Sequence, residues 1–322
     1  MPNNDTLYSD RMLSLGLARV SEQAAIAAAK LVGAGDEKAA DQAAVDAMRS
    51  QLNKLDIRGR IVIGEGERDE APMLYIGEKV GNGTGPEVDI ALDPLEGTTL
   101  CAKDMPNSLA VIAMGPKGSM LYAPDTYMEK LAIGPGYPTE VVTLDMSPTE
   151  RVLALATVKG VKPSDIMVCV LERPRHEEMI RELRETGAHI RLITDGDVAA
   201  IIHCAEAEKT GIDMYMGSGG APEGVLAAAA LKCMGGQMYG QLIFRNDDER
   251  ARARKTGVKD FDRIYALDDL ITDDVIFAAT GVTDGSVVSG ARRVDGYLET
   301  ETILMRSKTG SVRRLFYRQR NQ

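Results

Sequence analysis

The 322-residue sequence contains no tryptophan, and phenylalanine occurs only four times. The core therefore has to be built from aliphatic side chains, chiefly those of alanine, valine, isoleucine, leucine and methionine. Hydrophobic residues make up 44% of the chain and charged residues 27%, a balance that is typical of globular proteins. The length is sufficient for one large core or for two fused α/β halves.

Long apolar runs are also missing from the sequence. No segment reaches the roughly 18 uncharged apolar residues that a membrane-spanning helix needs. Residues 1–10 lack the basic start and apolar centre of a signal peptide, and we expect a frayed or adaptable N-terminus. The four cysteines form no CxxC pair, and we expect them to be reduced and partly buried. These absences predict a cytoplasmic protein without a membrane partner.

Positive charge is scarce as well. The 38 lysines and arginines are outnumbered by 48 aspartates and glutamates, which gives a net charge of −10. Because no basic stripe offsets this charge, a nucleic-acid partner is not expected. An anionic substrate would have to be bound through metal ions or through a local cluster of arginine and lysine.

The most informative stretch is residues 89–99, an apolar strand end that runs into a turn. A proline and a glycine stop the strand, and Asp93, Glu96 and Thr98 lie within six residues at the turn. Carboxylates held this close repel each other unless a cation or a proton lies between them. Ligand sets made only of oxygen suit Mg²⁺ or Mn²⁺. The alternative is an ordinary surface turn.

Two further acidic positions belong to similar patterns. A strand predicted over residues 60–63 runs into Gly64-Glu65-Gly66-Glu67, where glycines let a backbone approach a ligand closely. Asp41 lies four residues before Val45, on the core-facing stripe of a helix predicted over 36–55. A carboxylate on such a stripe is costly without a partner. A plain acidic loop and a first-turn acid that favours the helix dipole are the alternatives.

Periodicity and turn residues predict the other elements of the first half. They are a helix over 13–32, a helix over 72–79 that starts at Pro72, a strand over 88–92, paired strands over 109–114 and 119–122, and a strand over 127–133. Residues 134–148 are rich in proline and glycine, and we expect them to form a loop between two halves.

The second half alternates strands with helices, which predicts a mostly parallel sheet. The expected strands are 166–171, 189–193 and 212–216, and the expected helices are 177–185, 198–207 and 223–234. A solvated helix is expected over 246–263, and closing strands over 275–280, 286–288 and 301–316. In such sheets ligands bind beyond the carboxyl ends of the strands. Those ends carry Arg173-Pro174-Arg175-His176, Asp195-Gly196-Asp197 and the glycine-rich segment 217–224.

The glycine-rich segment 217–224 fits neither the dinucleotide-binding fingerprint nor the Walker pattern. It indicates a turn into a helix N-terminus that favours an anion or presents Glu223, with ordinary helix packing as the alternative. Arg173 and Arg175 are suited to bidentate phosphate contacts. Basic residues at a helix N-terminus oppose its dipole, and a bound phosphate would compensate them. A solvated charged loop is the alternative.

Two acidic segments together resemble the metal core of the lithium-sensitive sugar and inositol phosphatase superfamily. They are Gly64-Glu65-Gly66-Glu67 and Asp93-Pro94-Leu95-Glu96-Gly97-Thr98. Segments 69–78, 173–176, 195–197 and 219–224 narrow the resemblance to class II fructose-1,6-bisphosphatase, over about residues 15–316. Many superfamily members carry aspartate where Glu96 stands and a Trp-Asp motif that this chain lacks. Both differences favour class II.

The resemblance implies an α/β fold of mixed α+β type, the layered α-β-α-β-α sugar-phosphatase fold. It implies an N-terminal metal-binding half over 1–145 and a C-terminal substrate-binding half over 146–322. It implies a phosphatase using Mg²⁺ or Mn²⁺ that hydrolyses the 1-phosphate of fructose 1,6-bisphosphate in gluconeogenesis or the Calvin cycle. Sedoheptulose 1,7-bisphosphate stays open as a second substrate, and we expect a homo-oligomer, either a dimer or a tetramer. Another sugar or inositol phosphate as substrate, or a sensor without turnover, remain alternatives.

The resemblance also assigns roles to residues by their position. The implied metal ligands are Asp41, Glu65, Asp93, Glu96 and Glu223. The implied catalytic residues are Thr98 and Glu65. The implied substrate-binding residues are Glu96, Gly97, Thr98, Tyr127, Arg173, Pro174, Arg175, Asp195, Gly196, Asp197 and Gly219.

Overall fold

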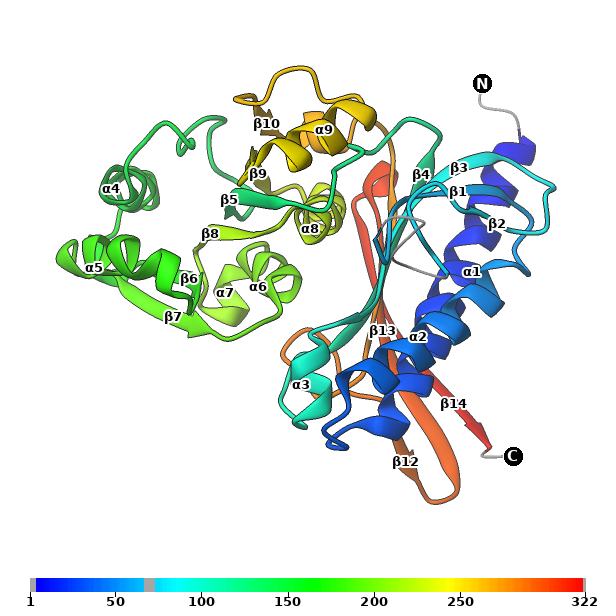
Figure 1. Cartoon of the computed structure of the whole chain (residues 1–322). Helices are drawn as coiled ribbons and strands as arrows, with labels where there is room; N and C mark the ends of the chain where they lie inside the picture. The colour runs from blue at the N-terminus through cyan, green and yellow to red at the C-terminus, as the bar shows by residue number, and fades with distance from the viewer. Residues whose placement is uncertain (1–3, 67–72, 321–322) are drawn as a thin grey trace. The chain divides into compact units, whose positions relative to one another are not determined.

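The computed structural model describes residues 4–66 and 73–320, and the chain divides into two compact units (Figure 1). Met1–Met120 and Asp273–Gln322 form the first unit, and Leu121–Thr272 form the second. These units do not coincide with the expected halves 1–145 and 146–322, because the C-terminal strands pair with strands of the first unit. The predicted division of function between the two halves stays a prediction.

The first unit is built around an eight-stranded sheet. Its strands are β1 (Arg58–Ile63), β2 (Lys79–Val80), β3 (Glu87–Glu96), β4 (Leu109–Pro116), β11 (Ile276–Gly281), β12 (Arg292–Val294), β13 (Tyr297–Arg306) and β14 (Ser311–Arg320). The strand order is β12-β13-β11-β4-β3-β1-β2, and β14 pairs with β13. Neighbours are antiparallel except for β1 and β3, which are parallel.

Helices α1 (Asn4–Ala28) and α2 (Glu37–Leu52) lie along one face of this sheet (Figure 1). A short helix α3 (Thr98–Ala102) follows β3, and the 3₁₀ turns are η1 (Ala29–Leu31) and η4 (Ser307–Thr309). The core between helices and sheet is aliphatic, as the composition predicts, and includes Leu17, Met48 and Ile90. The backbone of residues 4–10, within the segment expected to be frayed or adaptable, is part of helix α1.

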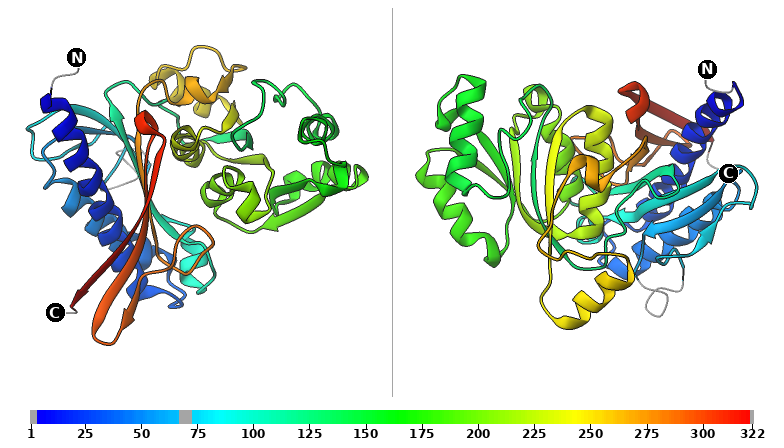
Figure 2. Two further views of the ribbon diagram at one scale, coloured as in Figure 1. Left: turned by 180° about the vertical axis from the view of Figure 1, so that it is seen from behind. Right: turned by 90° about the horizontal axis from the view of Figure 1, so that it is seen from above.

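The second unit contains a six-stranded sheet with the order β10-β9-β5-β8-β6-β7. Its strands are β5 (Tyr127–Ile133), β6 (Met167–Leu171), β7 (His189–Ile193), β8 (Met214–Gly220), β9 (Gln237–Ile243) and β10 (Ile264–Ala266). Its helices are α4 (Pro148–Lys159), α5 (Glu177–Glu185), α6 (Asp197–Cys204), α7 (Ala207–Thr210), α8 (Ala221–Met234), α9 (Asp247–Lys255) and α10 (Leu267–Leu270), with 3₁₀ turns η2 (Pro163–Asp165) and η3 (Pro174–His176). Helices α4 and α5 pack on one face of the sheet, and α6 and α8 lie on the other (Figure 2).

The α/β class with two mixed sheets agrees with the sequence prediction, but the second sheet is not mostly parallel. Only β8, β6 and β7 are parallel to one another. Strand β5, which sequence reasoning placed in the first half, inserts antiparallel between β8 and β9. The prediction was wrong because the pairing partners of β5 are remote in sequence, and local periodicity does not encode them.

Several local predictions were also wrong or incomplete. Residues 73–78 form turns rather than a helix, and Pro72 lies outside the described residues. The expected strand over 119–122 is reduced to a single bridge residue, and 286–288 form no strand, because β4 pairs with β3 and β11 instead. The helix expected over 246–263 ends at Lys255. Strands β9 and β10 were not predicted.

Helix α4 was also missed, although the sequence carries its start signal. Ser147 caps the helix by accepting a hydrogen bond from the backbone N–H of Glu150 at 3.2 Å. The Glu150 carboxylate in turn accepts from the backbone N–H of Ser147 at 2.7 Å, which completes a capping box around Pro148. Ser-Pro-Thr-Glu was therefore a readable helix start.

The cysteines and the lengths of the apolar helices were both the subject of predictions from the sequence. All four cysteines are free and buried. No helix within the described ranges has the length and apolar character needed to cross a membrane.

Glu22 on α1 predicts a pH-dependent stability. Burial raises its pKa from 4.5 to about 7, and nearby Arg19 acts in the opposite direction. Since the folded-state pKa exceeds the unfolded value, stability should fall as pH rises from about 4.5 to about 7. Glu22→Gln should remove this loss and be about 1–3 kcal/mol more stable than wild type at pH 8, with little difference at pH 4.5. Urea unfolding at the two pH values tests this, and equal differences at both would contradict it.

Candidate active site

The carboxyl ends of β1 and β3 bring the predicted metal ligands of the first unit to one edge of its sheet. The two strands are parallel, with Ile63 paired to Ala91. Glu65 follows the end of β1 by two residues, and Asp93 lies two residues beyond Ala91 in β3. The backbone N–H of Glu65 donates to the carbonyl oxygen of Leu74 at 3.1 Å, which anchors the loop. The glycine before it is required, because a β-carbon at Gly64 would lie 2.1 Å from that oxygen.

Asp93 and Glu96 are close enough to share a cation. Their carboxylates place oxygens within 4.8 Å of one another, and Glu96 is only 5% exposed. Asp93 Oδ1 also accepts from the backbone N–H of Leu95 at 3.0 Å, which fixes the turn. In the described part of the first unit, no other carboxylate, histidine or cysteine has a ligand atom within 4.8 Å of the ligand oxygens of both Asp93 and Glu96. The donor set is oxygen only, so the residues fit a hard divalent ion such as Mg²⁺ or Mn²⁺.

Asp41 occupies the position that its sequence spacing predicts. The core-facing stripe of α2 is buried at Ala40, Ala44, Val45 and Met48, and Asp41 beside it is half-buried. Burial raises the pKa of the Asp41 carboxyl. Helix α2 packs against α3 and β3, the elements that bear the acidic turn, as well as against α1.

Thr98 is the first residue of α3, directly after a glycine that the backbone requires. Gly97 has φ 76°, in the left-handed region, and a β-carbon there would lie 2.8 Å from Leu100 Cδ1. Its carbonyl oxygen accepts from the backbone N–H of Cys101 at 3.0 Å. The turn thus starts a new helix within two residues of Glu96 and leaves the Thr98 side chain half-buried.

In the second unit, two arginines flank the ring of Tyr127. The Arg175 guanidinium lies 4.8 Å and the Arg245 guanidinium 4.9 Å from the ring centroid. Arg245 is fixed by Glu249, which is 1% exposed and accepts from Arg245 Nε at 2.7 Å. Thr126 donates to the same carboxylate at 3.1 Å. Tyr127 and Arg175, two of the residues that the resemblance assigns to substrate binding, therefore lie together, and Arg245 joins them.

His176 holds Arg175 in place through Ser218. The backbone N–H of Ser218 donates to His176 Nε2 at 2.9 Å, so the ring proton is on Nδ1 and donates to the Leu171 carbonyl at 2.7 Å. Burial lowers the pKa of His176, and the neighbouring arginines lower it further, while the hydrogen bond to the Leu171 carbonyl acts in the opposite direction. Arg175 Nε donates to Ser218 Oγ at 2.9 Å, and its Nη2 donates to the Ser218 carbonyl at 2.6 Å.

Asp197 is committed to a buried ion pair. Lys130, which is fully buried, donates to Asp197 Oδ2 at 2.5 Å, and the Tyr215 hydroxyl lies 3.4 Å from the same oxygen. A β-carbon at Gly219 would lie 2.5 Å from that oxygen, so a glycine is needed there. Asp195, two residues earlier, is half-buried and accepts from the backbone N–H of Gly196 at 3.0 Å.

Glu223 lies in the first turn of helix α8, and Arg173 directly precedes the 3₁₀ turn η3. Glu223 is in the first turn of α8, and a β-carbon at Gly220 would lie 1.9 Å from its Oε2, so its carboxylate folds back over the helix start. Arg173 is half-buried and donates from Nη1 to the Glu172 carbonyl at 3.0 Å. Pro174 is the exposed first residue of η3.

A family described as bacterial fructose-1,6-bisphosphatase, glpX-encoded, has a sequence model that matches residues 11–319. The chain belongs to this family. Two similar proteins bear the name D-fructose 1,6-bisphosphatase class 2/sedoheptulose 1,7-bisphosphatase. One, from Synechococcus sp. (strain JA-3-3Ab), is 45% identical over 94% of this chain and 94% of its own length. The other, from Synechococcus sp. (strain RCC307), is 44% identical over 94% of this chain and 95% of its own.

A solved structure of an inositol monophosphatase from Anabaena (Nostoc) sp. PCC 7120 is also similar. It shares 15% sequence identity, covers 63% of this chain and 72% of its own, and has a TM-score of 0.31. This score is too low to support an argument about the fold, which rests here on the two sheets themselves.

The sequence analysis of this bacterial fructose-1,6-bisphosphatase did not identify Arg245 as a candidate site residue. It follows β9, a strand that was not predicted, and therefore it was not assigned to a strand end. The signal available was Arg245 four residues before Glu249, a spacing at which opposite charges meet on a helix. Glu67 and the segment 69–72, which contributed to the resemblance, lie outside the described residues.

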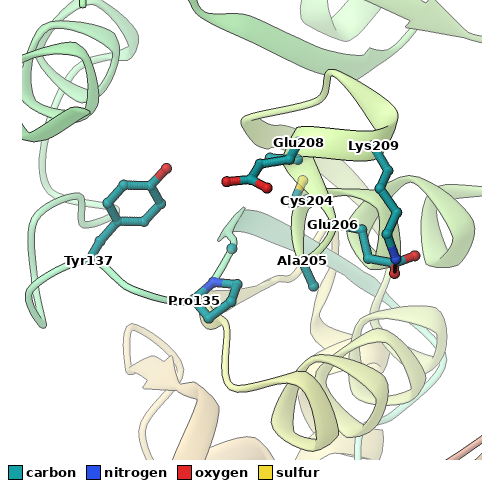
Figure 3. A pocket seen from close by; sticks show the side chains of 9 residues that line it. Pro135, Tyr137, Cys204, Ala205, Glu206, Glu208 and Lys209 are labelled. Carbon is teal, nitrogen blue, oxygen red and sulfur yellow. Dashed lines mark hydrogen bonds and ion pairs between the residues drawn. The ribbon is translucent and has the colours of Figure 1, made fainter. Parts of the chain in front are cut away.

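A separate pocket of about 330 Å³ in the second unit contains none of the predicted site residues. It lies at the far end of β5 from Tyr127, about 20 Å along the strand. Figure 3 shows Tyr137 and Glu208 on facing sides of it. Glu206 and Lys209 on its rim form an ion pair with each other.

Proposed function

We propose that this protein hydrolyses the 1-phosphate of fructose 1,6-bisphosphate to give fructose 6-phosphate and phosphate. Its family membership over residues 11–319 carries this proposal, and the close pair of Asp93 and Glu96 gives it a chemical basis. The similar Synechococcus proteins are also named sedoheptulose 1,7-bisphosphatases, so we include that substrate in the proposal. We place the reaction in gluconeogenesis or the Calvin cycle, in the cytoplasm, in a homo-oligomer of two or four chains.

The first unit is proposed to supply the metal-binding carboxylates, namely Asp41, Glu65, Asp93 and Glu96, with Glu223 of the second unit as a further ligand. Mg²⁺ or Mn²⁺ bound there would coordinate phosphate oxygens and lower the pKa of an attacking water. A sugar bisphosphate carries roughly three to four negative charges. The chain has a net charge of −10 and would repel such a substrate. Bound divalent ions would make the local charge at the site positive and so attract it.

Thr98 is proposed to orient the attacking water, and Glu65 to take its proton. Phosphoryl transfer requires in-line attack and neutralisation of the developing charge, and a hydroxyl and a carboxylate at the acidic turn would serve the first requirement. The left-handed Gly97 supports this assignment, because it ends β3 directly after Glu96 and makes Thr98 the first residue of α3.

The second unit is proposed to bind the phosphate that is not cleaved. Arg173 and Arg175 would contact it, and Tyr127, Asp195, Asp197 and the 219 backbone would bind the rest of the substrate. Arg175 supports this proposal because its guanidinium is held by Ser218 and stacked on Tyr127, and is therefore preorganised. We propose Arg245 as a further contributor, since its guanidinium lies 4.9 Å from the centroid of the same ring.

Arg175→Ala should lower kcat/KM for fructose 1,6-bisphosphate by about 10- to 100-fold, because a charged hydrogen bond contributes roughly 1.5–3 kcal/mol. Glycerol phosphate, which has no second phosphate, should be affected much less. Arg175→Lys should recover only part, since lysine loses the bidentate fork. Arg254→Ala is the matched control, because Arg254 stacks on Phe261 at 4.9 Å outside the site. An unchanged ratio of kcat/KM for the two substrates in Arg175→Ala would refute this assignment.

The choice of substrate can be tested with one kinetic comparison. We expect kcat/KM to be highest for fructose 1,6-bisphosphate, with sedoheptulose 1,7-bisphosphate hydrolysed as well and inositol and glycerol monophosphates far behind. A preference for an inositol phosphate would replace the proposed substrate. Binding of the bisphosphates without phosphate release would instead indicate a sensor.

A further inference from the structure

Residues 74–78 of the first unit hold the loop that follows β1 and carries Glu65. The carbonyl oxygen of Leu74 accepts from the backbone N–H of Glu65 at 3.1 Å. The backbone N–H of Ile76 donates to the carbonyl oxygen of Gly66 at 2.9 Å, so the loop is bonded on both sides of the Glu65 side chain. The conformation of this segment therefore sets where the Glu65 backbone lies.

Leu74 has an unusual backbone conformation. Its φ is 55°, in the left-handed region that residues with a β-carbon rarely adopt. Its side chain is fully buried in the core of the first unit. Left-handed residues other than glycine persist only where their surroundings fix them, and they concentrate at functional sites. The conformation of Leu74 therefore requires a partner that fixes it.

Glu78 fixes Leu74 with one oxygen of its carboxylate and is itself fixed through the other. Its Oε2 accepts from the backbone N–H of Leu74, and its Oε1 accepts from Arg49 Nε at 2.7 Å. The Glu78 side chain is only 7% exposed, and a buried carboxylate that accepts two such hydrogen bonds has one favoured orientation. The Glu78 backbone is held as well, because its carbonyl oxygen accepts from the N–H of Ile61 in β1 at 2.9 Å.

These contacts run from helix α2 to the Glu65 loop. Arg49 lies on α2, the helix that also carries Asp41. We propose that Glu78 and Arg49 are positioning residues, which act through Leu74 to hold Glu65 where it can bind a divalent ion. This inference rests on the proposed function, in which Asp41 and Glu65 are metal ligands. Residues that orient metal ligands typically contribute about 10- to 100-fold to metal affinity.

Calorimetric titration of metal-free protein with MnCl₂ tests this proposal without substrate. Glu78→Gln should weaken Mn²⁺ binding by about tenfold, because glutamine loses the charge that strengthens both hydrogen bonds. Asp213→Asn is the matched control, since the Asp213 side chain is 8% exposed, pairs with Lys159 and accepts from the backbone N–H of Met167 at 2.8 Å. Those partners lie on α4 and β6, which carry no proposed ligand. Both substitutions should lower the Tm, but the control should leave Mn²⁺ binding unchanged. Wild-type affinity in Glu78→Gln, or an equal loss in the control, would overturn the proposal.

Arg49→Gln separates positioning from a simple effect of charge. The substitution removes a positive charge, which through space would tighten Mn²⁺ binding. Loosening of Glu78 would instead weaken Mn²⁺ binding, by about two- to fivefold, which is the result we expect. The fold should be kept, because the Arg49 side chain is 41% exposed. Arg49→Lys keeps a charged donor and should restore most of the affinity. Tighter Mn²⁺ binding in Arg49→Gln would overturn the proposal.

Glu65→Gln distinguishes failure of this proposal from failure of the proposed function. If Glu78 acts through Glu65, the double variant should bind Mn²⁺ about as weakly as Glu65→Gln alone. Losses that multiply would show that Glu78 does not act through Glu65, and would overturn the positioning role. A loss in Glu65→Gln with none in Glu78→Gln would overturn it too, while leaving Glu65 as a ligand. Unchanged Mn²⁺ binding in Glu65→Gln would overturn both the ligand role of Glu65 and the positioning role.

Discussion

Asp93→Asn is expected to lower phosphate release from fructose 1,6-bisphosphate by about 10³-fold, even with saturating Mn²⁺, because it removes charge from the proposed metal centre. The fold should be preserved, since Asp93 is half-buried and asparagine can still accept from the backbone N–H of Leu95. The metal-free variant should also have a higher Tm than metal-free wild type. The reason is that the substitution removes repulsion from Glu96, whose oxygens lie within 4.8 Å.

Glu65→Gln should behave in the same way, and Asp46→Asn is the matched control. Asp46 is an exposed carboxylate on α2 that bonds to Gln42 at 2.9 Å, so its loss should change neither activity nor metal response. Activity of Asp93→Asn within about tenfold of wild type would show that this carboxylate is not a ligand whose charge the reaction needs.

Thr98→Ala is expected to lower kcat by about 10²-fold or more while KM changes little, the pattern of a contact made in the transition state. Thr98→Ser should retain part of the activity, because it keeps the hydroxyl. The Tm should change little, since the Thr98 side chain is only half-buried and α3 is started by the Gly97 backbone.

Thr99→Ala supplies the control for that experiment, because Thr99 is the next residue of α3 and is equally half-buried. Near-normal kcat in Thr98→Ala together with a large loss in Thr99→Ala would move the proposed role to Thr99. Equal small losses in both would mean that neither hydroxyl takes part in the chemical step.

The candidate site could be predicted to the extent that its signals are local. Asp93, Glu96 and Thr98 are close in space because they are close in sequence, and Pro94 and Gly97 force the turn that gathers them. That both apolar runs end in carboxylates was readable from the sequence, whereas the parallel pairing of β1 and β3 is known only from the structure. The half-buried position of Asp41 also followed from a four-residue spacing on one helix.

What could not be predicted depends on contacts between distant segments. The C-terminal strands β11, β13 and β14 extend the first sheet through the pairing of β11 with β4, and periodicity gives strand type but no partner. Strand β5 is likewise paired with β8 and β9, roughly 80 to 115 residues later in the chain. Arg245 reaches Tyr127 only because of that pairing, so its place beside Arg175 was not readable from the sequence.

Hydrolysis of fructose 1,6-bisphosphate by this bacterial fructose-1,6-bisphosphatase is proposed to depend on a divalent metal ion. The most direct measurement is phosphate release from fructose 1,6-bisphosphate by wild-type protein after exhaustive chelation and after restoration of Mn²⁺, with the sugar product identified. We predict no turnover in chelator, recovery with Mn²⁺ or Mg²⁺, and one fructose 6-phosphate formed for each phosphate released. Full turnover in chelator, or fructose 1-phosphate as the product, would contradict the account.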